Sequence, residues 1–393
     1  MKRKRQHYVP QFYLGNFSDE RSYVRILTVD GRLIPEASYK SQCYENYFYG
    51  QDGIVEAELG MLESQAAPII HRLVNSENIG IADDEKNRLR QYMLYQYFRT
   101  SQFSNFLTER TADTVAEIAK MQFPSLDNKT LKDAASSVIS DKEMLTPAKC
   151  FSLAKNLCPN ILDLDVIVVA FKQHYQLLCS DNPVIMLNMF AKQHLGVGMM
   201  GLTMILPISS NRVLIAYDSL LIDRENKTPS YDDVKMLNML QQYSSNEIVI
   251  SSPSMDISML NRLTKQYSAL QKMKKKINHV QTLDSPTDKV IMFSNQWIDL
   301  DYKFSFLHLN NMARSIPIAY RDSLSRWKTP EWEKRVSIYP IMSQIKAMDN
   351  RAYDKMKEIA YKYWESHEAR FGHLYPEVLQ SNSTSNSSNN GES

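Results

Sequence analysis

The stretch His7-Tyr8-Val9-Pro10-Gln11-Phe12-Tyr13-Leu14-Gly15-Asn16-Phe17 follows a basic leader and combines a histidine, a proline and four aromatic rings. Pro10 restricts Val9 to an extended backbone, and in an extended chain His7 and Tyr8 point to opposite sides. We therefore expect Tyr8 and its apolar neighbours to anchor the segment to the rest of the fold. His7 can do chemistry, although a lone histidine is more often a hydrogen-bonded structural residue than a base or ligand.

The size and composition of the chain predict one intertwined globular body. Its 393 residues suffice for one large or two ordinary domains, and 43% hydrophobic and 23% charged residues are ordinary globular usage. The net charge is only +2, so the whole molecule exerts no strong attraction on nucleic acid or anionic membrane. Basic surfaces must be local, and the two candidates, residues 2–5 and 272–276, can equally be solvated charge runs.

The cysteines and the hydropathy pattern predict a cytoplasmic protein. Cys43, Cys150, Cys158 and Cys179 stand too far apart for a Cys-x-x-Cys metal clip or a compact disulfide framework. This favours buried free thiols in a reducing compartment. No window approaches the roughly 18 uninterrupted apolar residues of a membrane-spanning helix, so we expect a soluble protein without a membrane partner.

The first 160 residues are predicted to be mostly helical after a small β hairpin. Residues 23–29 read as a strand, Asp30-Gly31 is a strong hairpin signal, and residues 32–34 form the returning strand. Apolar residues at spacings of three and four predict a helix over residues 54–75. Further helices are expected over residues 83–101, 104–121 and 129–140, and from Pro147 onward.

After Pro159 the chain changes to β-rich segments. Strands are predicted over residues 164–170, 175–179, 184–186, 202–208 and 212–217. Because the connections are too short for helical crossovers, we expect an antiparallel meander with 175–179 as the neighbour of 164–170. The remaining predicted elements are helices over 231–244, 255–274 and 349–367 and strands over 247–251 and 289–293.

These elements define an α+β fold in which a mostly helical N-terminal half packs on an antiparallel sheet, with a small N-terminal β hairpin. The core over 7–275 divides into an α-rich part, 7–160, and an antiparallel β part with helices, 161–275. The expected flanking segments are a basic leader over 1–6, an α/β C-terminal extension over 276–379 and a disordered tail over 380–393. The tail is rich in Ser and Asn and has nothing to bury.

Familiar catalytic motifs are missing from the sequence. It contains no Gly-rich phosphate loop, no His-Glu-x-x-His zinc motif, no nucleophile elbow and no kinase or zinc-finger spacing. Gly196-Val197-Gly198 precedes a strand instead of joining a strand to a helix, so it is read as a flexible loop. The familiar nucleotide enzymes are therefore disfavoured.

Several polar residues could carry chemistry, and each also has a structural explanation. Glu56 and Glu63 share one helix face about 10 Å apart, an arrangement that also suits a solvated acidic side. Gln96 and Arg99 share a helix face among aromatic neighbours, so they are either exposed or placed in a polar pocket. Asp181 directly follows a strand, where it can close a turn, hold a metal or orient a histidine.

Together these motifs resemble the bacterial domain of unknown function 4238 (DUF4238) family, which is uncharacterised. The resemblance covers about residues 3–270. It rests on the opening motif from His7, the stretch 43–49, the helix of Glu56 and Glu63, Gln96 with Arg99-Thr100, and Ser180-Asp181-Asn182-Pro183-Val184. Gly15 departs from the family pattern, in which Arg is common at this position. The resemblance implies no reaction, but it implies that His7, Glu56, Glu63, Gln96, Arg99 and Asp181 converge on one pocket.

Two classes of function stay open at this point. The first is a metal-assisted phosphodiester hydrolase, nuclease-like, acting on nucleic acid or a nucleotide in bacterial defence or as a toxin. Its catalytic residues would be His7, Glu63, Arg99 and Asp181, its Mg²⁺ or Mn²⁺ ligands Glu56, Glu63 and Asp181, and its binding residues Tyr8, Gln11, Asn16, Gln96 and Asn182. The second is a non-catalytic binding or interaction protein, in which the polar residues form a buried network and the 22 tyrosines supply contact surface. The oligomeric state stays open.

Overall fold

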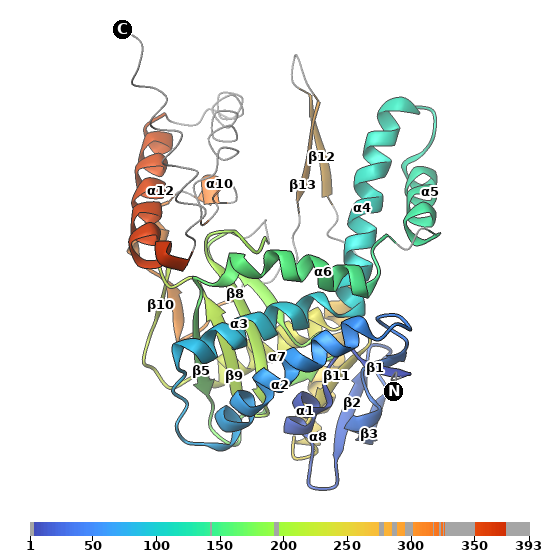
Figure 1. Ribbon diagram of the computed structural model, residues 1–393, viewed down its shortest axis with the longest axis vertical. Helices are drawn as coiled ribbons and strands as arrows, with labels where there is room; N and C mark the ends of the chain where they lie inside the picture. Colours follow the sequence, from blue (N-terminus) through green and yellow to red (C-terminus); the bar gives the residue numbers. More distant parts are fainter. Residues whose placement is uncertain are drawn as a thin grey trace.

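Two four-stranded antiparallel sheets form the centre of the computed structural model (Figure 1). Helices lie against these sheets, which confirms the predicted α+β class. The structure describes residues 4–141, 144–191, 196–274, 279–284, 289–294, 302–316, 318–321, 324, 326 and 350–374. The predicted tail, 380–393, and the start of the predicted leader lie outside the described residues.

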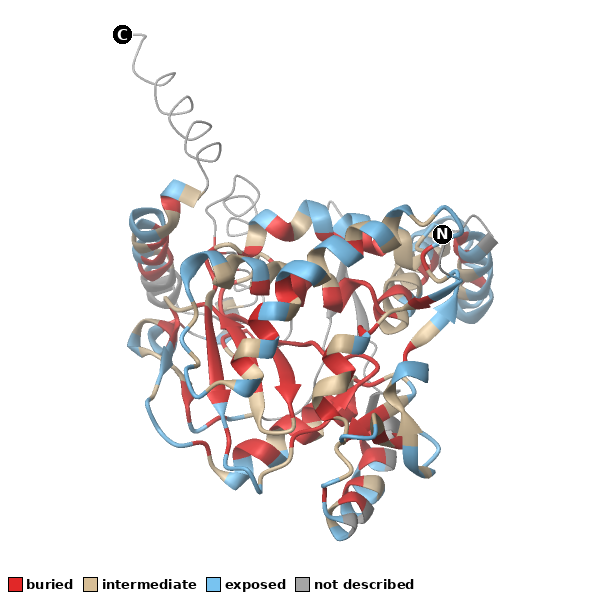
Figure 2. Ribbon diagram, turned by 60° about the horizontal axis from the view of Figure 1, so that its bottom comes forward, coloured by how far each residue is buried: buried red, intermediate tan, exposed pale blue. Residues whose placement is uncertain are grey.

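The first sheet carries a hydrophobic core on each of its faces. Its strand order is β5 (Asp165–Ala170), β9 (Arg212–Tyr217), β8 (Leu202–Ser209) and β7 (Ile185–Asn188). Successive side chains of a strand point to opposite faces. In β5, Val166 and Val168 join one apolar cluster, whereas Ile167 and Val169 join the other. Every residue of β8 is consequently buried, and Figure 2 shows the central strands as the most buried part of the fold.

The second sheet contains the predicted N-terminal hairpin. Its order is β3 (Leu33–Ser38), β2 (Tyr23–Thr28), β11 (Ile248–Ser251) and β6 (Cys179–Ser180). Between β2 and β3, Gly31 takes a φ of 87°, which a residue without a Cβ adopts without strain. The hairpin is thus joined to the body of the protein by β11, which lies more than two hundred residues later in the chain.

The sequence predicts residues 175–179 as a strand beside 164–170, and this pairing is wrong. Only Cys179 and Ser180 form a strand, and they pair with β11 in the second sheet. Asn238, on helix α7 (Tyr231–Ser244), accepts a hydrogen bond from the Leu178 amide at 2.8 Å and donates to the Gln176 carbonyl at 2.9 Å. A side chain therefore takes the place of a neighbouring strand.

Five predicted helices form in the N-terminal half. They are α2 (Ile54–Asn75), α3 (Asp83–Phe98), α4 (Ser101–Gln122), α5 (Asn128–Asp141) and α6 (Pro147–Leu157). The break between α3 and α4 falls earlier than predicted, because the Thr100 hydroxyl accepts the Phe103 amide and caps α4. In Figure 1, α2, α3 and α6 lie across the sheets, whereas α4 and α5 extend away from them.

Helix α8 (Ile257–Lys274) packs on the second sheet, where Leu260, Leu263 and Tyr267 are buried with Leu27 and Val249. The other elements of the C-terminal part are β10 (Ile222–Arg224) paired with β14 (Leu307–Leu309), the hairpin of β12 (His279–Asp284) and β13 (Lys289–Ser294), α9 (Asn311–Ser315), α10 (Ile318–Arg321) and α12 (Asn350–Phe371). Ala360, Tyr363 and Trp364 of α12 are buried in the same apolar cluster as Ile167 and Val169. The predicted strand 289–293 and helix 349–367 are therefore confirmed, and β12 is an additional strand.

The cysteine prediction is confirmed, since all four cysteines are buried free thiols. Burial raises the pKa of Cys43 and Cys179 well above the ordinary value for a thiol. Among the helices of the described residues, none is long and apolar enough to cross a membrane.

Candidate functional site

The opening motif begins as a short two-stranded ribbon. β1 (Arg5–His7) pairs with β4 (Tyr44–Asn46) in antiparallel register, and His7 stands opposite Tyr44. We call these two strands the N-terminal ribbon. Arg5 and Gln6, which the sequence places in the leader, therefore belong to the fold.

Behind the ribbon, the predicted anchor is formed by apolar side chains of the motif. Val9, Tyr13, Leu14 and Phe17 are almost fully buried in the main core. The Tyr13 hydroxyl donates to the carbonyl of Pro207 in β8 at 2.6 Å. The motif is thus fixed to the central sheet by both packing and a hydrogen bond.

Arg99, at the end of α3, is the centre of a buried polar network. Its side chain is 3% exposed and donates to Glu63 Oε1 at 2.6 Å, to the Tyr49 hydroxyl at 3.0 Å and to the His7 carbonyl at 2.5 Å. Burial opposes the charge of Arg99, but Tyr49 and Glu63 outweigh that effect and raise the pKa of Arg99. Arg99 therefore ties the N-terminal ribbon to α2 and α3, and Glu63 neutralises its charge.

Gln96 lies one helical turn before Arg99 and binds the same segment. It is 1% exposed, and its Nε2 donates to the Tyr8 carbonyl at 2.9 Å. Its Oε1 and the hydroxyl of Tyr92, one turn further back, are buried without a hydrogen-bond partner among the described residues. Residues 92, 96 and 99 thus line one face of α3. Both oxygens thus have unused hydrogen-bonding capacity at that face.

Asp181 acts as an acceptor for the backbone. Its Oδ1 accepts the amide of Asn246 at 2.9 Å, and its Oδ2 accepts the amides of Glu247 at 2.6 Å and Ile248 at 3.2 Å. These three amides belong to the turn that leads into β11. The charge of Asp181 also adds to burial in raising the pKa of Tyr8, which places the carboxylate near the opening motif.

Asn182 links this turn to the arginine network. Its Oδ1 accepts the hydroxyl of Thr100, the residue after Arg99, at 3.1 Å. Its Nδ2 donates to the carbonyl of Ser244 at the end of α7 at 3.1 Å. Asn182 and Thr100 therefore join the second sheet, α3 and α7.

His7 lies at the outer edge of the network. Its Nε2 is 3.2 Å from the Lys40 carbonyl oxygen and 3.1 Å from Gln11 Nε2, which itself donates to the Lys40 carbonyl. The imidazole ring lies 5.4 Å from the ring of Tyr44. The backbone of His7 is thus buried in the network, whereas its side chain faces the surface of the ribbon.

Two other predicted site residues are Asn16 and Glu56. Asn16 has a buried Nδ2 without a hydrogen-bond partner among the described residues. Burial raises the pKa of Tyr49 to about 12; Arg99 opposes this shift, and the charges of Glu56 and Glu63 add to it. Tyr49 itself was missed as a site residue, because its sequence signal is one ring in an aromatic stretch.

The structure does not bring Glu56, Glu63 and Asp181 together as metal ligands. Among the residues that the structure describes, no group of three or more His, Cys, Asp and Glu side chains is placed to hold a metal ion. Glu63 Oε1 is occupied by Arg99, and both oxygens of Asp181 accept backbone amides. Arg99 thus links His7 and Glu63, and Gln96 binds the adjacent Tyr8 carbonyl, whereas Asp181 binds the turn before β11.

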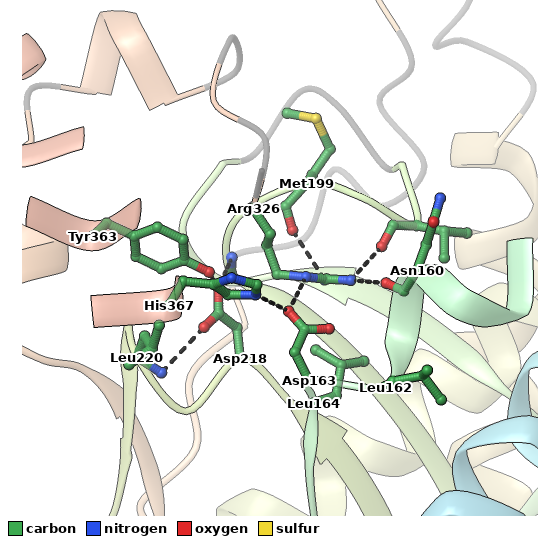
Figure 3. A network of polar contacts seen from close by, with 12 residues as sticks. Asn160, Leu162, Asp163, Leu164, Met199, Asp218, Leu220, Arg326, Tyr363 and His367 are labelled. Atoms are coloured by element: carbon green, nitrogen blue, oxygen red, sulfur yellow. Dashed lines mark hydrogen bonds and ion pairs between the residues drawn. The ribbon is translucent and has the colours of Figure 1, made fainter. Parts of the chain in front are cut away.

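A second buried polar network, which the sequence reading missed, fixes the C-terminal part (Figure 3). Asp163 Oδ2 pairs with Arg326 Nε at 2.7 Å and with His367 Nε2 at 2.9 Å. Arg326 also donates to the carbonyls of Val197, Met199 and Asn160. Burial disfavours the Asp163 carboxylate, but Arg326 and His367 outweigh it and keep the pKa of Asp163 below its ordinary value.

Asp218 completes this second network. Its Oδ2 accepts the Gly201 amide at 2.9 Å and the hydroxyl of Tyr363, on α12, at 3.0 Å. Burial raises the pKa of Asp218. No periodicity or motif in the sequence marks these residues, because their partners are brought together only by the docking of α12.

The fold and the first network define an α+β protein whose N-terminal ribbon is held on its helices by a buried arginine–glutamate pair. The model of the family described as "Protein of unknown function (DUF4238)" matches residues 5–255, and the chain belongs to this family. Neither a curated protein nor a solved structure matches the chain. The ribbon, the arginine network and Asp163 lie within the matched residues, whereas Arg326 and His367 lie beyond them.

Proposed function

We propose that the protein binds single-stranded nucleic acid on the outer face of the N-terminal ribbon. The proposal rests on one observation, the alternation of basic and aromatic side chains on that face. Arg5 and His7 occupy the same face of β1, and Tyr44 of β4, opposite His7, lies on that face too. The Arg5 guanidinium lies 5.0 Å from the centre of the Tyr44 ring, and the His7 ring lies 5.4 Å from it.

Two further cations lie near the ribbon, since Lys4 directly precedes β1 and the Lys40 carbonyl oxygen lies 3.2 Å from His7 Nε2. Lys4 and Lys40 are exposed, and the ammonium of Lys40 lies 6.0 Å from the ring of Tyr39. Single strands are bound by cationic grooves that follow the phosphates and by aromatic rings on which the bases stack. The charges are local, which agrees with a net charge of only +2 for the whole chain.

The arginine network supports the proposal by holding the ribbon rigid. Arg99 and Gln96 bind the carbonyls of His7 and Tyr8, so the backbone beneath the proposed surface is fixed before a ligand arrives. A binding surface that is already ordered loses less conformational entropy on association. In this account the motif residues position the surface, and the ribbon side chains touch the nucleic acid.

The test is fluorescence anisotropy with labelled single-stranded DNA and RNA and duplex DNA of equal length. Tyr44→Ala should weaken single-strand binding by about 1 to 3 kcal/mol, the range for loss of one stacked base. Arg5→Glu and Lys40→Glu should weaken it and reduce the salt dependence, by a log–log slope of about 0.7 for each lost phosphate contact. Lys172→Glu, which makes the same charge change at an exposed site after β5, is the matched control. Equal effects of Lys40→Glu and Lys172→Glu would reject the ribbon as the binding surface.

Phosphodiester hydrolysis is a second candidate, and the geometry of Glu63 favours it. Its Oε1 is held by Arg99, its side chain is 26% exposed, and its Oε2 takes part in no hydrogen bond among the described residues. Mg²⁺ is often held by one or two carboxylates together with water and substrate phosphates. Cleavage of the same oligonucleotides with Mg²⁺ or Mn²⁺ should then be lost in Glu63→Gln. Binding by the wild type without cleavage would leave the first proposal standing and reject this one.

A further inference from the structure

Helices α4 and α5 form a hairpin that extends from the body of the protein (Figure 1). We call residues 101–141 the helical hairpin. Its own apolar cluster consists of Ala112, Ala135 and Ile139, with Leu145 packed against it. Two of these side chains are alanines.

Large apolar side chains of the helical hairpin are exposed instead. The exposed residues are Val115, Ile118, Met121, Phe123, Leu126 and Val138, each between 42% and 53% exposed. Single exposed apolar residues are normal on a protein surface, but a contiguous group on one element marks an interaction site. Val115, Ile118 and Met121 succeed one another at intervals of three along α4, so they form one stripe.

The spacing on α4 is that of a helix that pairs with another helix. Thr111, Thr114, Ile118 and Met121 follow one another at intervals of three, four and three residues. This is the heptad spacing of a coiled-coil seam. The seam lies on the opposite side of α4 from the buried Ala112 and Ala116, and Ala112 packs against Ala135 and Ile139 of α5.

The charged residues beside this seam form opposite-charge pairs when two copies of α4 lie antiparallel. Arg110 and Glu117 are seven residues apart, so they lie on the same flank of the seam. Neither takes part in an ion pair within the described part of the chain: the Arg110 guanidinium lies 5.5 Å from the centre of the Phe106 ring, and Glu117 accepts a hydrogen bond from Asn128. When two copies of α4 run antiparallel, equivalent flanks meet, and Arg110 of each copy faces Glu117 of the other.

We propose that the helical hairpin is a dimerisation surface, and that its occupant is the hairpin of a second copy of this chain. Two copies of α4 related by a two-fold axis pair along this seam, which buries Ile118 and Met121 of both copies with Val115 on its flank, while each α5 stays on the outer side of its α4. A two-fold axis makes every contact occur twice. Arg110 of one copy then faces Glu117 of the other at two places in the dimer. The proposal is independent of nucleic-acid binding by the ribbon.

The test is the molecular mass of the full chain in solution, measured by sedimentation velocity over a range of concentrations. Wild type should be a dimer, and Ile118→Glu should be a monomer. Met61→Glu is the matched control, because Met61 is 60% exposed on α2, outside the hairpin, and the charge introduced is the same. Circular dichroism of each variant separates a lost dimer from a lost fold.

A charge exchange tests the antiparallel arrangement. Arg110→Glu and Glu117→Arg each place like charges opposite one another twice, and each should weaken the dimer by about tenfold or more. The double variant Arg110→Glu with Glu117→Arg restores the opposite charges and should recover the wild-type dissociation constant. A monomeric wild type at about 100 µM, where specific complexes are populated, would overturn the proposal. So would a double variant that is weaker than both single variants.

Discussion

Arg99 and Glu63 come from different helices and meet at 2.6 Å, with the arginine side chain 3% exposed and the glutamate side chain 26% exposed. The arginine also donates hydrogen bonds to the His7 carbonyl and the Tyr49 hydroxyl. The pair therefore holds three segments in place, and the glutamate is the member that keeps contact with solvent.

Removing the arginine should destabilise the fold strongly. Arg99→Met leaves the Glu63 carboxylate and the His7 carbonyl without their donor, and a broken buried pair costs about 3 to 5 kcal/mol. The partial exposure of Glu63 places the expected loss at the lower end of that range. The control is Lys155→Met, whose ion pair with Glu58 at 2.9 Å is exposed on both sides and should contribute less than about 1 kcal/mol. Urea denaturation measures both, and equal losses would contradict a structural role for Arg99.

Two tyrosines near this pair should respond in opposite ways to loss of the hydroxyl. The Tyr49 hydroxyl is bonded to Arg99, so Tyr49→Phe should cost about 1 to 3 kcal/mol. The Tyr92 hydroxyl is buried without a partner among the described residues, so Tyr92→Phe should leave stability unchanged or raise it. The melting temperatures of both variants, compared with that of the wild type, test this prediction. A clear loss in Tyr92→Phe would mean that a bound water or ligand satisfies its hydroxyl.

Asp181→Asn should disturb the turn before β11. Both carboxylate oxygens accept backbone amides, and an asparagine would turn its own amide toward one of these donors. The expected loss is about 1 to 3 kcal/mol, with faster hydrogen exchange at residues 246–248. Asp84→Asn, whose side chain is 66% exposed on α3, should leave both measurements unchanged. Unchanged exchange at residues 246–248 in Asp181→Asn would contradict this account.

The buried Asp163 carboxylate of the second network should make the free energy of unfolding decrease at acid pH. The pKa of Asp163 is lowered in the folded protein, so the contacts of its carboxylate with Arg326 and His367 stabilise the fold above the ordinary Asp value of 3.8. This contribution is lost as the pH falls from that value through the lower pKa of the folded state. Asp163→Asn should be less stable at neutral pH and show a shallower decline of stability below pH 3.8. Parallel declines in wild type and variant would show that other carboxylates control acid unfolding.

The four thiols should not react with thiol reagents in the native protein. Burial raises the pKa of Cys43, Cys150, Cys158 and Cys179, and the thiolate is the reactive form. Ellman's reagent at mildly alkaline pH should therefore detect no thiol in the folded chain and all four after denaturation in guanidinium. A rapidly reacting thiol in the native state would show that one of the four is more accessible than its burial indicates.

The sequence by itself determined the elements and their class. The spacing of apolar residues predicted α2 with its observed bounds, and Asp30-Gly31 predicted the hairpin of β2 and β3. These signals are local, because a turn or an amphipathic stripe is specified by neighbours in the chain. The polar motif residues could be named from the sequence for the same reason, as short groups that resemble a family.

Only the tertiary structure decided what those residues contact. Strand pairing is a long-range choice, and so the neighbour of Cys179 proved to be β11 instead of β5. A carboxylate in a sequence can equally face solvent, a metal or an arginine, and the docking of α3 against α2 and the ribbon turned Glu63 toward Arg99. Asp163, Arg326 and His367 meet across about two hundred residues of chain, where no local pattern connects them. The physical reason is that the free energy of a buried charge depends on partners that only the folded chain supplies.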